Sequence, residues 1–447
     1  MTWRDDRSPL AAFTSLVLVT CAFVVSCSPA DCTHAGPRPN ILLVVVDTLR
    51  ADHLGSYGYT RDTSPHLDSL AADAIRYTRA FSQAPWTTPA MAALMTSRHP
   101  ASLGITNIQS PLPDDVVLLP EILSRAGYDT AAFVSHSFVS EKWGFARGFD
   151  TFDQSQVKGH MATTSPRLSD LALAWLEARG VGDAPFFLFV HYFDPHFGYL
   201  DQPGFGFGGR DPSYTGSVRS GVLPARFDKR TESLSDADLR ELERLYDSEI
   251  ALTDRAIGRL LDFLRESDLY DSSLVIVTGD HGEEFLDHGA LDHTKTLYDE
   301  LMNVPLIVKL PGRAPAVVDR PVALVDLLPT VTDWLEIEPP DGVRGLSLLA
   351  EPTEPRPILL ETQRLRRLRG VVYGQHKLIV DLESGAVELF DLSADPDERN
   401  DLSDESAELV EALRLLLDSL SSQGGLRGQP LELNDEERER LKALGYL

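Results

Sequence analysis

Two apolar segments from distant parts of the chain end abruptly in acidic residues. Residues 41–46 (ILLVVV) lead into Asp47, and residues 274–277 (LVIV) lead through a Thr-Gly pair into Asp280 and His281. Short continuous apolar runs are typical of strands buried on both faces of a parallel sheet. Open α/β sheets place their ligands at the carboxyl ends of such strands. We therefore expect Asp280 and His281, together with Asp47, to reach one divalent cation; an ordinary Gly- and Asp-rich turn is the alternative.

Similar apolar runs, separated by helical patterns, continue along most of the chain. They lie at 130–134, 186–191 and 304–309. The longest helical pattern covers 236–266, and Ser235 is its expected N-cap. Strands that alternate with helices predict an α/β fold, in which a mostly parallel sheet is sandwiched by helices.

The pattern changes near the C-terminus, where short strand candidates follow one another before a helix. The expected elements are strands at 357–361, 369–373, 377–380 and 387–391 and a helix near 404–420. A last helix is expected at 435–444.

Four regions follow from these patterns. We expect a leader and linker at 1–38, a large α/β domain at 39–350, a small-sheet subdomain at 351–425 and a helical tail at 426–447.

The leader has the features of an export signal. Its apolar run at residues 10–25 is too short for a transmembrane helix, and it ends in Val24-Val25-Ser26-Cys27, which resembles a bacterial lipobox. We expect an exported protein, periplasmic or at the cell surface, with a lipid on Cys27; ordinary secretion is the alternative. All three cysteines lie in this leader, so the folded body holds no disulfide and no cysteine-ligated metal.

The net negative charge of the chain limits the kinds of molecule that it can bind. The chain has 41 basic and 68 acidic residues, which gives a formal net charge of −27. This excess argues against nucleic acid or an anionic membrane surface as a partner, because both would be repelled. We expect contact with a membrane only through the N-terminal lipid or signal segment.

Two adjacent threonines precede a short apolar helix pattern. In APWTTPAMAALMTSRHP, Thr87 and Thr88 stand before Pro89. Hydroxyl groups at a helix N-terminus beside a metal ion are the components of an activated nucleophile. We expect Thr88 to be the N-cap and Pro89 to occupy the first helical position.

These segments, in this order, resemble the sulfatase family of the alkaline phosphatase superfamily. The resemblance extends to LPEILSRAGYDTAAFVSH, FFLFVHYFDPHFGY, NVPLIVKLPG and ELFDLSADPDERNDL. It implies a catalytic domain followed by a small α+β subdomain, an antiparallel sheet with one helix.

The chain differs from that family at the centre of the site. Sulfatases carry Cys-x-Pro-x-Arg, or Ser in place of Cys, and oxidise the first residue to formylglycine. Here Thr87 stands in that slot and Met91 in the Arg slot, and Thr48 replaces a second aspartate. The resemblance then implies no formylglycine and direct attack by Thr87, as in phosphatase, phosphonate hydrolase and phosphoethanolamine transferase relatives. An inert Thr87, or Thr88 as the nucleophile, is the alternative.

The same resemblance implies the metal ligands. Asp47, Asp280 and His281 match family ligand positions, and the expected ion is Ca²⁺, with Mg²⁺, Mn²⁺ and Zn²⁺ as alternatives. Because Thr48 adds no charge, we expect weaker binding than at a site with four charged ligands.

In the segment HYFDPH, His196 matches the family histidine that contacts the transferred group or assists the leaving group. Asp194 is a candidate for substrate binding. His191 continues the strand, and we expect it to pack in the interior.

Four further candidates follow from the resemblance. Three lie in the loosely aligned stretch from His288 to Tyr298, and the fourth, Arg98, matches the family's second signature arginine. His293 and Lys295 are candidate general acids near the leaving oxygen, with a solvated loop as the alternative. His288 is a substrate-binding candidate that could instead brace its turn, and Arg98 is one that could instead anchor the end of its helix.

Two functions fit these residues. The first is a metal-dependent, sulfatase-like ester hydrolase that cleaves small-molecule or glycan sulfate esters, or closely related phospho- or phosphonoesters, with Thr87 as the nucleophile. Transfer to another acceptor differs from it only in the last step. The second is a catalytically inactive protein that binds sulfated or phosphorylated glycans.

Overall fold

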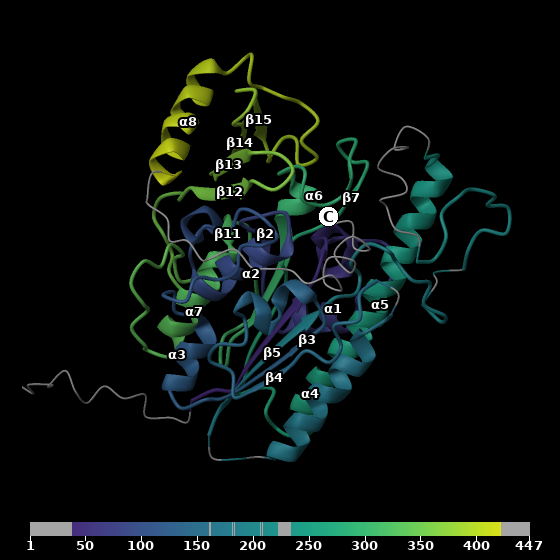
Figure 1. Ribbon diagram of the computed structural model, residues 1–447, viewed down its shortest axis with the longest axis vertical. Helices are drawn as coiled ribbons and strands as arrows, with labels where there is room; N and C mark the ends of the chain where they lie inside the picture. The colour runs from purple at the N-terminus through teal and green to yellow at the C-terminus, as the bar shows by residue number, and fades with distance from the viewer. Residues whose placement is uncertain are drawn as a thin grey trace, which may run out of the picture. The chain divides into compact units, whose positions relative to one another are not determined.

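Parallel strands at the centre of one large sheet form the frame of the fold (Figure 1). The computed structural model describes residues 38–221, apart from 161, 181, 183, 206 and 208, together with residues 234–421. Within them the strand order is β10-β2-β9-β6-β1-β5-β3-β4, and β11 also pairs with β2. The strands are β1 (Ile41–Val46), β2 (Ile75–Phe81), β3 (Asp129–Val134), β4 (Thr151–Asp153), β5 (Phe186–Tyr192), β6 (Leu274–Gly279), β9 (Asn303–Lys309), β10 (Ala316–Val318) and β11 (Val322–Ala323).

The central strands end at one level. β1 lies between β5 and β6 and is parallel to both, and Val46 is in register with Tyr192 and Gly279. Asp47 and Asp280 therefore follow neighbouring strands at the same edge. The expectation of a mostly parallel sheet is confirmed, although β9 runs antiparallel to β6 and to β2.

Helices cover both faces of this sheet (Figure 1). Alternate residues of β1 pack into opposite cores: Leu43 and Val45 face one, and Leu42 and Val44 face the other. Burial on both faces explains why the strand is apolar throughout. The first core is covered by α2 (Thr87–Thr96), α3 (Leu119–Arg125) and α7 (Leu327–Trp334), and the second by α1 (Pro65–Ala72), α4 (Ser165–Arg179) and α5 (Asp236–Glu266).

The longest helix has the bounds predicted from its sequence. α5 spans Asp236–Glu266, and the Ser235 side chain accepts a hydrogen bond from the backbone N–H of Asp238. The Asp238 carboxylate accepts the backbone N–H of Ser235 in return. This capping box starts the helix where the sequence predicts it.

A second, smaller sheet follows the large one. Its antiparallel order is β12-β13-β14-β15, and α8 (Ala407–Ser421) packs on one of its faces through Leu413 and Leu417. The predicted small sheet with one helix is thereby confirmed. The strands are β12 (Ile358–Thr362), β13 (Leu368–Tyr373), β14 (His376–Asp381) and β15 (Val387–Asp391).

A buried ion-pair cluster joins the small sheet to the large domain. Lys377 of β14 is fully buried and lies 2.7 Å from a carboxylate oxygen of Asp299, in α6 (Asp299–Met302), and 2.9 Å from one of Glu398. Beside it, His288 Nδ1 lies 2.7 Å from Glu300, and His288 Nε2 lies 3.0 Å from the backbone carbonyl of Glu398. We call these five residues the seam.

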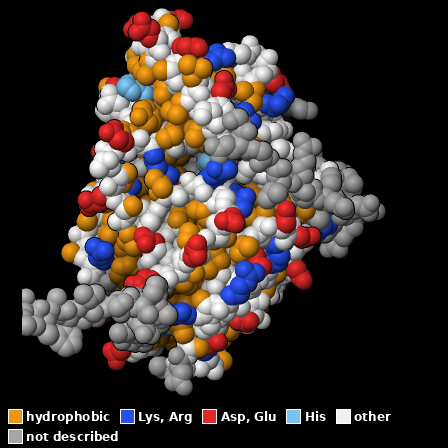
Figure 2. Space-filling view, turned by 90° about the vertical axis from the view of Figure 1, so that its left-hand side faces the viewer, with side chains coloured by type: hydrophobic (Ala, Val, Ile, Leu, Met, Phe, Trp, Pro, Cys, Tyr) orange, Lys and Arg blue, Asp and Glu red, His pale blue; other side chains and the backbone are white. Residues whose placement is uncertain are grey.

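The surface shows no large field of one charge sign on the face seen in Figure 2, where acidic and basic side chains are interspersed among apolar ones. Among the described residues, no helix is both long and apolar enough to cross a membrane. The lipobox at Cys27 and the predicted helix at 435–444 lie outside the described residues.

Candidate active site

Two carboxylates and an imidazole meet at the edge where β1 and β6 end. His281 Nε2 lies 3.6 Å from an oxygen of Asp47 and 3.5 Å from an oxygen of Asp280. All three side chains are fully buried. The structure thus brings together Asp47, which follows β1, with Asp280 and His281, which follow β6.

These carboxylates lack the partners that buried charges normally have. Neither oxygen of Asp47 accepts a hydrogen bond within the described part of the chain, and neither does Asp280 Oδ2. Burial, and then the charges of Asp280 and Glu283, raise the pKa of Asp47 well above its usual value. Buried acids without a counter-charge are costly, so a divalent cation between them would remove the cost.

The histidine of this group is oriented to accept a cation. His281 Nδ1 lies 2.9 Å from the backbone carbonyl of Gly282, so Nδ1 donates and carries the proton. The lone pair of Nε2 is then directed toward Asp47 and Asp280. Burial lowers the pKa of His281 to about 4, which keeps the ring neutral, as a metal ligand must be. The residues therefore fit a divalent ion.

Thr87 is the hydroxyl that lies beside this group. It is the first residue of α2, and its Oγ1 lies 3.5 Å from His281 Nε2. The expected cap is wrong, because Trp86 is the N-cap and Pro89 is the third helical residue, where its missing N–H breaks no helical hydrogen bond. The Thr88 hydroxyl has no hydrogen-bond partner among the described residues, and Met91 packs in the core.

Two histidines that sequence reasoning did not assign to the site also reach it. His136 follows β3, and its Nε2 lies 3.7 Å from Asp47. Its Nδ1 accepts the backbone N–H of Phe138, so the neutral ring carries its proton on Nε2. His191, in β5, is buried as expected, but a ring nitrogen lies within 4.8 Å of carboxylate oxygens of Asp47 and Asp280. The signal available was the same as for the acids, since both residues stand at the ends of parallel strands.

The rings of His196 and His293 pack edge to face, with centroids 4.9 Å apart. His196 also lies within ligand distance of Asp47. His293 Nδ1 lies 2.8 Å from a carboxylate oxygen of Asp292 and 3.0 Å from one of Glu283. Burial opposes a charge on His293, but the two carboxylates outweigh it and raise its pKa to about 9. This arrangement suits a proton donor.

The other sequence candidates have structural partners. Lys295 Nζ donates to the backbone carbonyl of Leu291, at 3.2 Å. Arg98 stands just past the C-terminal end of α2, opposite to Thr87, and donates to the backbone carbonyl of Asp341. The Asp194 carboxylate accepts hydrogen bonds from the backbone and hydroxyl groups at the start of α4.

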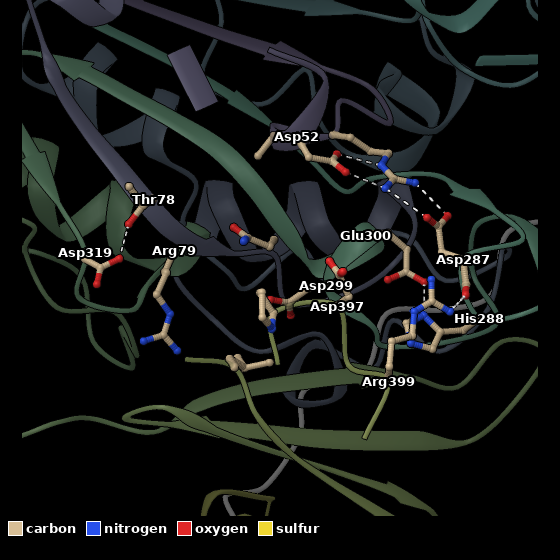
Figure 3. Close-up of a pocket in the computed structure, with 15 residues that line it drawn as sticks. Asp52, Thr78, Arg79, Asp287, His288, Asp299, Glu300, Asp319, Asp397 and Arg399 are labelled. Carbon is tan, nitrogen blue, oxygen red and sulfur yellow. Dashed lines mark hydrogen bonds and ion pairs between the residues drawn. The ribbon is translucent and has the colours of Figure 1, made fainter. Parts of the chain in front are cut away.

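His288 lines a separate, charged cleft of about 380 Å³ (Figure 3). There Arg50 forms ion pairs with Asp52 and Asp287, at 2.7 and 2.9 Å, and Arg399 donates to the backbone of Asp287. Both nitrogens of the His288 ring are occupied in the seam, which agrees with its alternative role as a brace.

Comparison with known proteins agrees with this geometry. The family model described as Sulfatase matches residues 39–337. An ulvan-active sulfatase of Formosa agariphila is 27% identical over 371 residues, which cover 76% of this chain and 70% of that protein.

Two solved structures, each 21% identical, share the fold. One is a protein solved with its substrate D-glucosamine-2-N,6-O-disulfate, with a TM-score of 0.73 over 86% of this chain and 97% of that one. The other is the phosphonate monoester hydrolase of Agrobacterium radiobacter, with a TM-score of 0.72 over 90% and 99%. The chain belongs to the Sulfatase family and is a sulfatase-like ester hydrolase.

Proposed function

We propose that this protein is a metal-dependent hydrolase of sulfate or phosphate-like esters and that Thr87 is its nucleophile. The observation that carries the proposal is the Thr87 hydroxyl beside Asp47, Asp280 and His281, a buried group whose carboxylates lack partners. Known sulfatases and a phosphonate monoester hydrolase among the similar proteins support the two ester classes.

Asp47, Asp280 and His281 would hold the metal, with Thr87 adjacent. Two carboxylates favour Ca²⁺, while the imidazole also allows Mg²⁺, Mn²⁺ or Zn²⁺. When bound, the ion would favour the alkoxide form of Thr87 and offset negative charge on the transferred group.

The chain's own residues supply the remaining functions. Thr87 attacks sulfur or phosphorus as its alkoxide, having given its proton to solvent. The bond to the leaving oxygen breaks, and His293, held by two carboxylates, donates a proton to that oxygen. Water then cleaves the threonine ester and returns a proton to His293. The Nε2–H of His136, 3.7 Å from Asp47, would donate to an oxygen of the transferred group.

The substrate would carry its ester on a small molecule or glycan. A direct threonine ester favours phosphorus chemistry, whereas similarity over the family model favours sulfate. In keeping with the predicted leader, the protein would act outside the cytoplasm, anchored through Cys27.

A binding protein without catalysis is the second candidate. The absence of the family's Cys, Arg and second Asp, replaced by Thr87, Met91 and Thr48, favours it. The retained hydroxyl, acids and histidines at one sheet edge favour the enzyme.

An activity panel separates the two. Aryl sulfate, phosphate monoester, phosphodiester and phosphonate ester would each be tested with Ca²⁺, Mg²⁺, Mn²⁺ and Zn²⁺. We expect metal-dependent turnover of at least one ester, lost in Thr87→Ala and kept in Thr88→Ala, the matched neighbour. Metal binding without any turnover would favour the binding protein, and turnover that survives Thr87→Ala would exclude this nucleophile.

A further inference from the structure

A sixth histidine, His160, lies at the rim of the active site. Its ring packs against His196 and Phe197, with centroids 5.0 and 4.7 Å apart, and against Phe193 at 5.3 Å. It is 8% exposed, whereas His136 and His293 are fully buried. His160 therefore stands between the catalytic cluster and the surface.

The ring nitrogens of His160 have no well-aligned hydrogen bond among the described residues, although the backbone of Phe197 lies close enough to act on the ring. Both nitrogens are buried. Burial lowers the pKa of His160 to about 3, against smaller opposing effects of the Asp292 charge and the Phe197 backbone, so the ring is neutral. A buried donor and acceptor left unpaired carry a cost that a native structure rarely keeps without a reason.

The chain a few residues after His160 is bonded to the segment that carries His196. Thr164 and Ser165, at the start of α4, direct two backbone N–H groups and two hydroxyls to the Asp194 carboxylate. Asp194 is two residues from His196. Residues 164 and 165 are thus tied to the segment that carries His196, the ring against which His160 packs.

His160 lies on the leaving-group side of the site. His196 and Phe197, the two rings that His160 packs against, also pack against His293, with centroids 4.9 and 5.5 Å apart. His293 and Asp292 form the proposed proton-donor pair. A group bound to His160 would accordingly belong to the alcohol part of the substrate.

We propose that His160 binds a hydroxyl group of the leaving alcohol, so that the site prefers esters of diols and polyols to esters of simple phenols, a preference that presupposes the ester hydrolysis proposed above. A neutral imidazole offers one donor and one acceptor, and a hydroxyl group is both. An anionic group is a poorer match, because the ring is neutral and Asp292 is near. Sites built around a substrate hydroxyl discriminate strongly against analogues that lack it.

The test uses His160→Phe, which keeps a buried ring against His196 and Phe197 but removes both nitrogens. We expect kcat/KM for a monosaccharide ester to fall about 10- to 100-fold, and kcat/KM for the 4-nitrophenyl ester of the same acid to stay within about twofold. His160→Asn, which restores a donor and an acceptor, should recover part of the loss. His376→Phe, in β14 of the small sheet, is the control and should change neither substrate.

A binding measurement makes the test independent of turnover. In a Thr87→Ala background, calorimetry with the same two esters should show weaker binding of the monosaccharide ester after His160→Phe and no change for the aryl ester. An equal loss for both esters would make His160 a packing residue and overturn the proposal, as would no loss for either. If neither ester is turned over by the unmodified protein, the proposed hydrolysis fails, while the calorimetry still decides the role of His160.

Discussion

The seam and the active site both bury charge, but they balance it differently. In the seam, the buried Lys377 ammonium lies within 3 Å of two carboxylates, at 2.7 Å from Asp299 and 2.9 Å from Glu398. At the sheet edge, Asp47 and Asp280 are as deeply buried, and three of their four oxygens have no hydrogen-bond partner among the described residues. The charges of the seam are paired within the protein, whereas the carboxylates of the proposed metal site are left without partners.

The largest expected effect on stability comes from removing the positive charge of the seam. Lys377→Met leaves the buried Glu398 and the half-buried Asp299 without their counter-charge and should lower the free energy of unfolding by about 3–5 kcal/mol. Denaturant unfolding would measure this. Lys158→Met, at an exposed position, should change it by less than about 0.5 kcal/mol. A loss for Lys377→Met as small as that of the control would show that the seam does not stabilise the fold.

At the proposed metal site, a bound cation should stabilise the fold. Ca²⁺ at about 100 times its Kd should raise the free energy of unfolding by about 2.7 kcal/mol. Asp47→Asn should abolish this gain, because it removes a charged ligand from the group. Equal stabilisation of the two proteins by Ca²⁺ would place the ion elsewhere.

In the absence of metal, Asp47→Asn should increase the stability of the protein. Asp47→Asn removes a buried charge that faces Asp280, so the metal-free variant should be more stable than the parent by about 1 kcal/mol while losing activity. Thermal unfolding in a chelator tests this. A variant that is less stable in the chelator would mean that Asp47 has structural partners after all.

The smallest effect is a pH dependence at the seam. Burial opposes a charge on His288, but its hydrogen bond to Glu300 outweighs this and raises its pKa from 6.5 to about 8. A raised pKa contributes stability that is fully present below about 6.5 and is lost as the pH rises through about 8. His288→Gln should reduce the fall in stability over this range, measured by unfolding at several pH values. Parallel curves for the two proteins would exclude His288 as the titrating group.

Much of this contrast could be predicted from sequence, because strand ends are local features. The apolar runs before Asp47 and Asp280 predicted where both acids meet, and Ser235 predicted the start of α5. The antiparallel direction of β9 depends on long-range pairing with β6, and the apolar pattern of its sequence does not predict it.

Side-chain roles were harder to predict than positions. His136 stands at a strand end just as the acids do, but a lone histidine there reads equally well as a core residue. His160 lies in an irregular segment with no periodic signal. Asp194 and Arg98 occur in family segments, yet Asp194 binds the start of α4 and Arg98 donates to the backbone of Asp341. A matching segment can therefore mark structure as well as chemistry.

Trapping the covalent intermediate tests the proposed role of Thr87 most directly. The protein would be quenched during turnover of an aryl ester and digested, and the peptide that contains Thr87 would be examined by mass spectrometry beside Thr87→Ala and Thr88→Ala. We expect this peptide to gain the mass of one sulfuryl or phosphoryl group on Thr87, also in Thr88→Ala but not in Thr87→Ala. Turnover without any adduct on Thr87, or with the adduct on another residue, would contradict the mechanism.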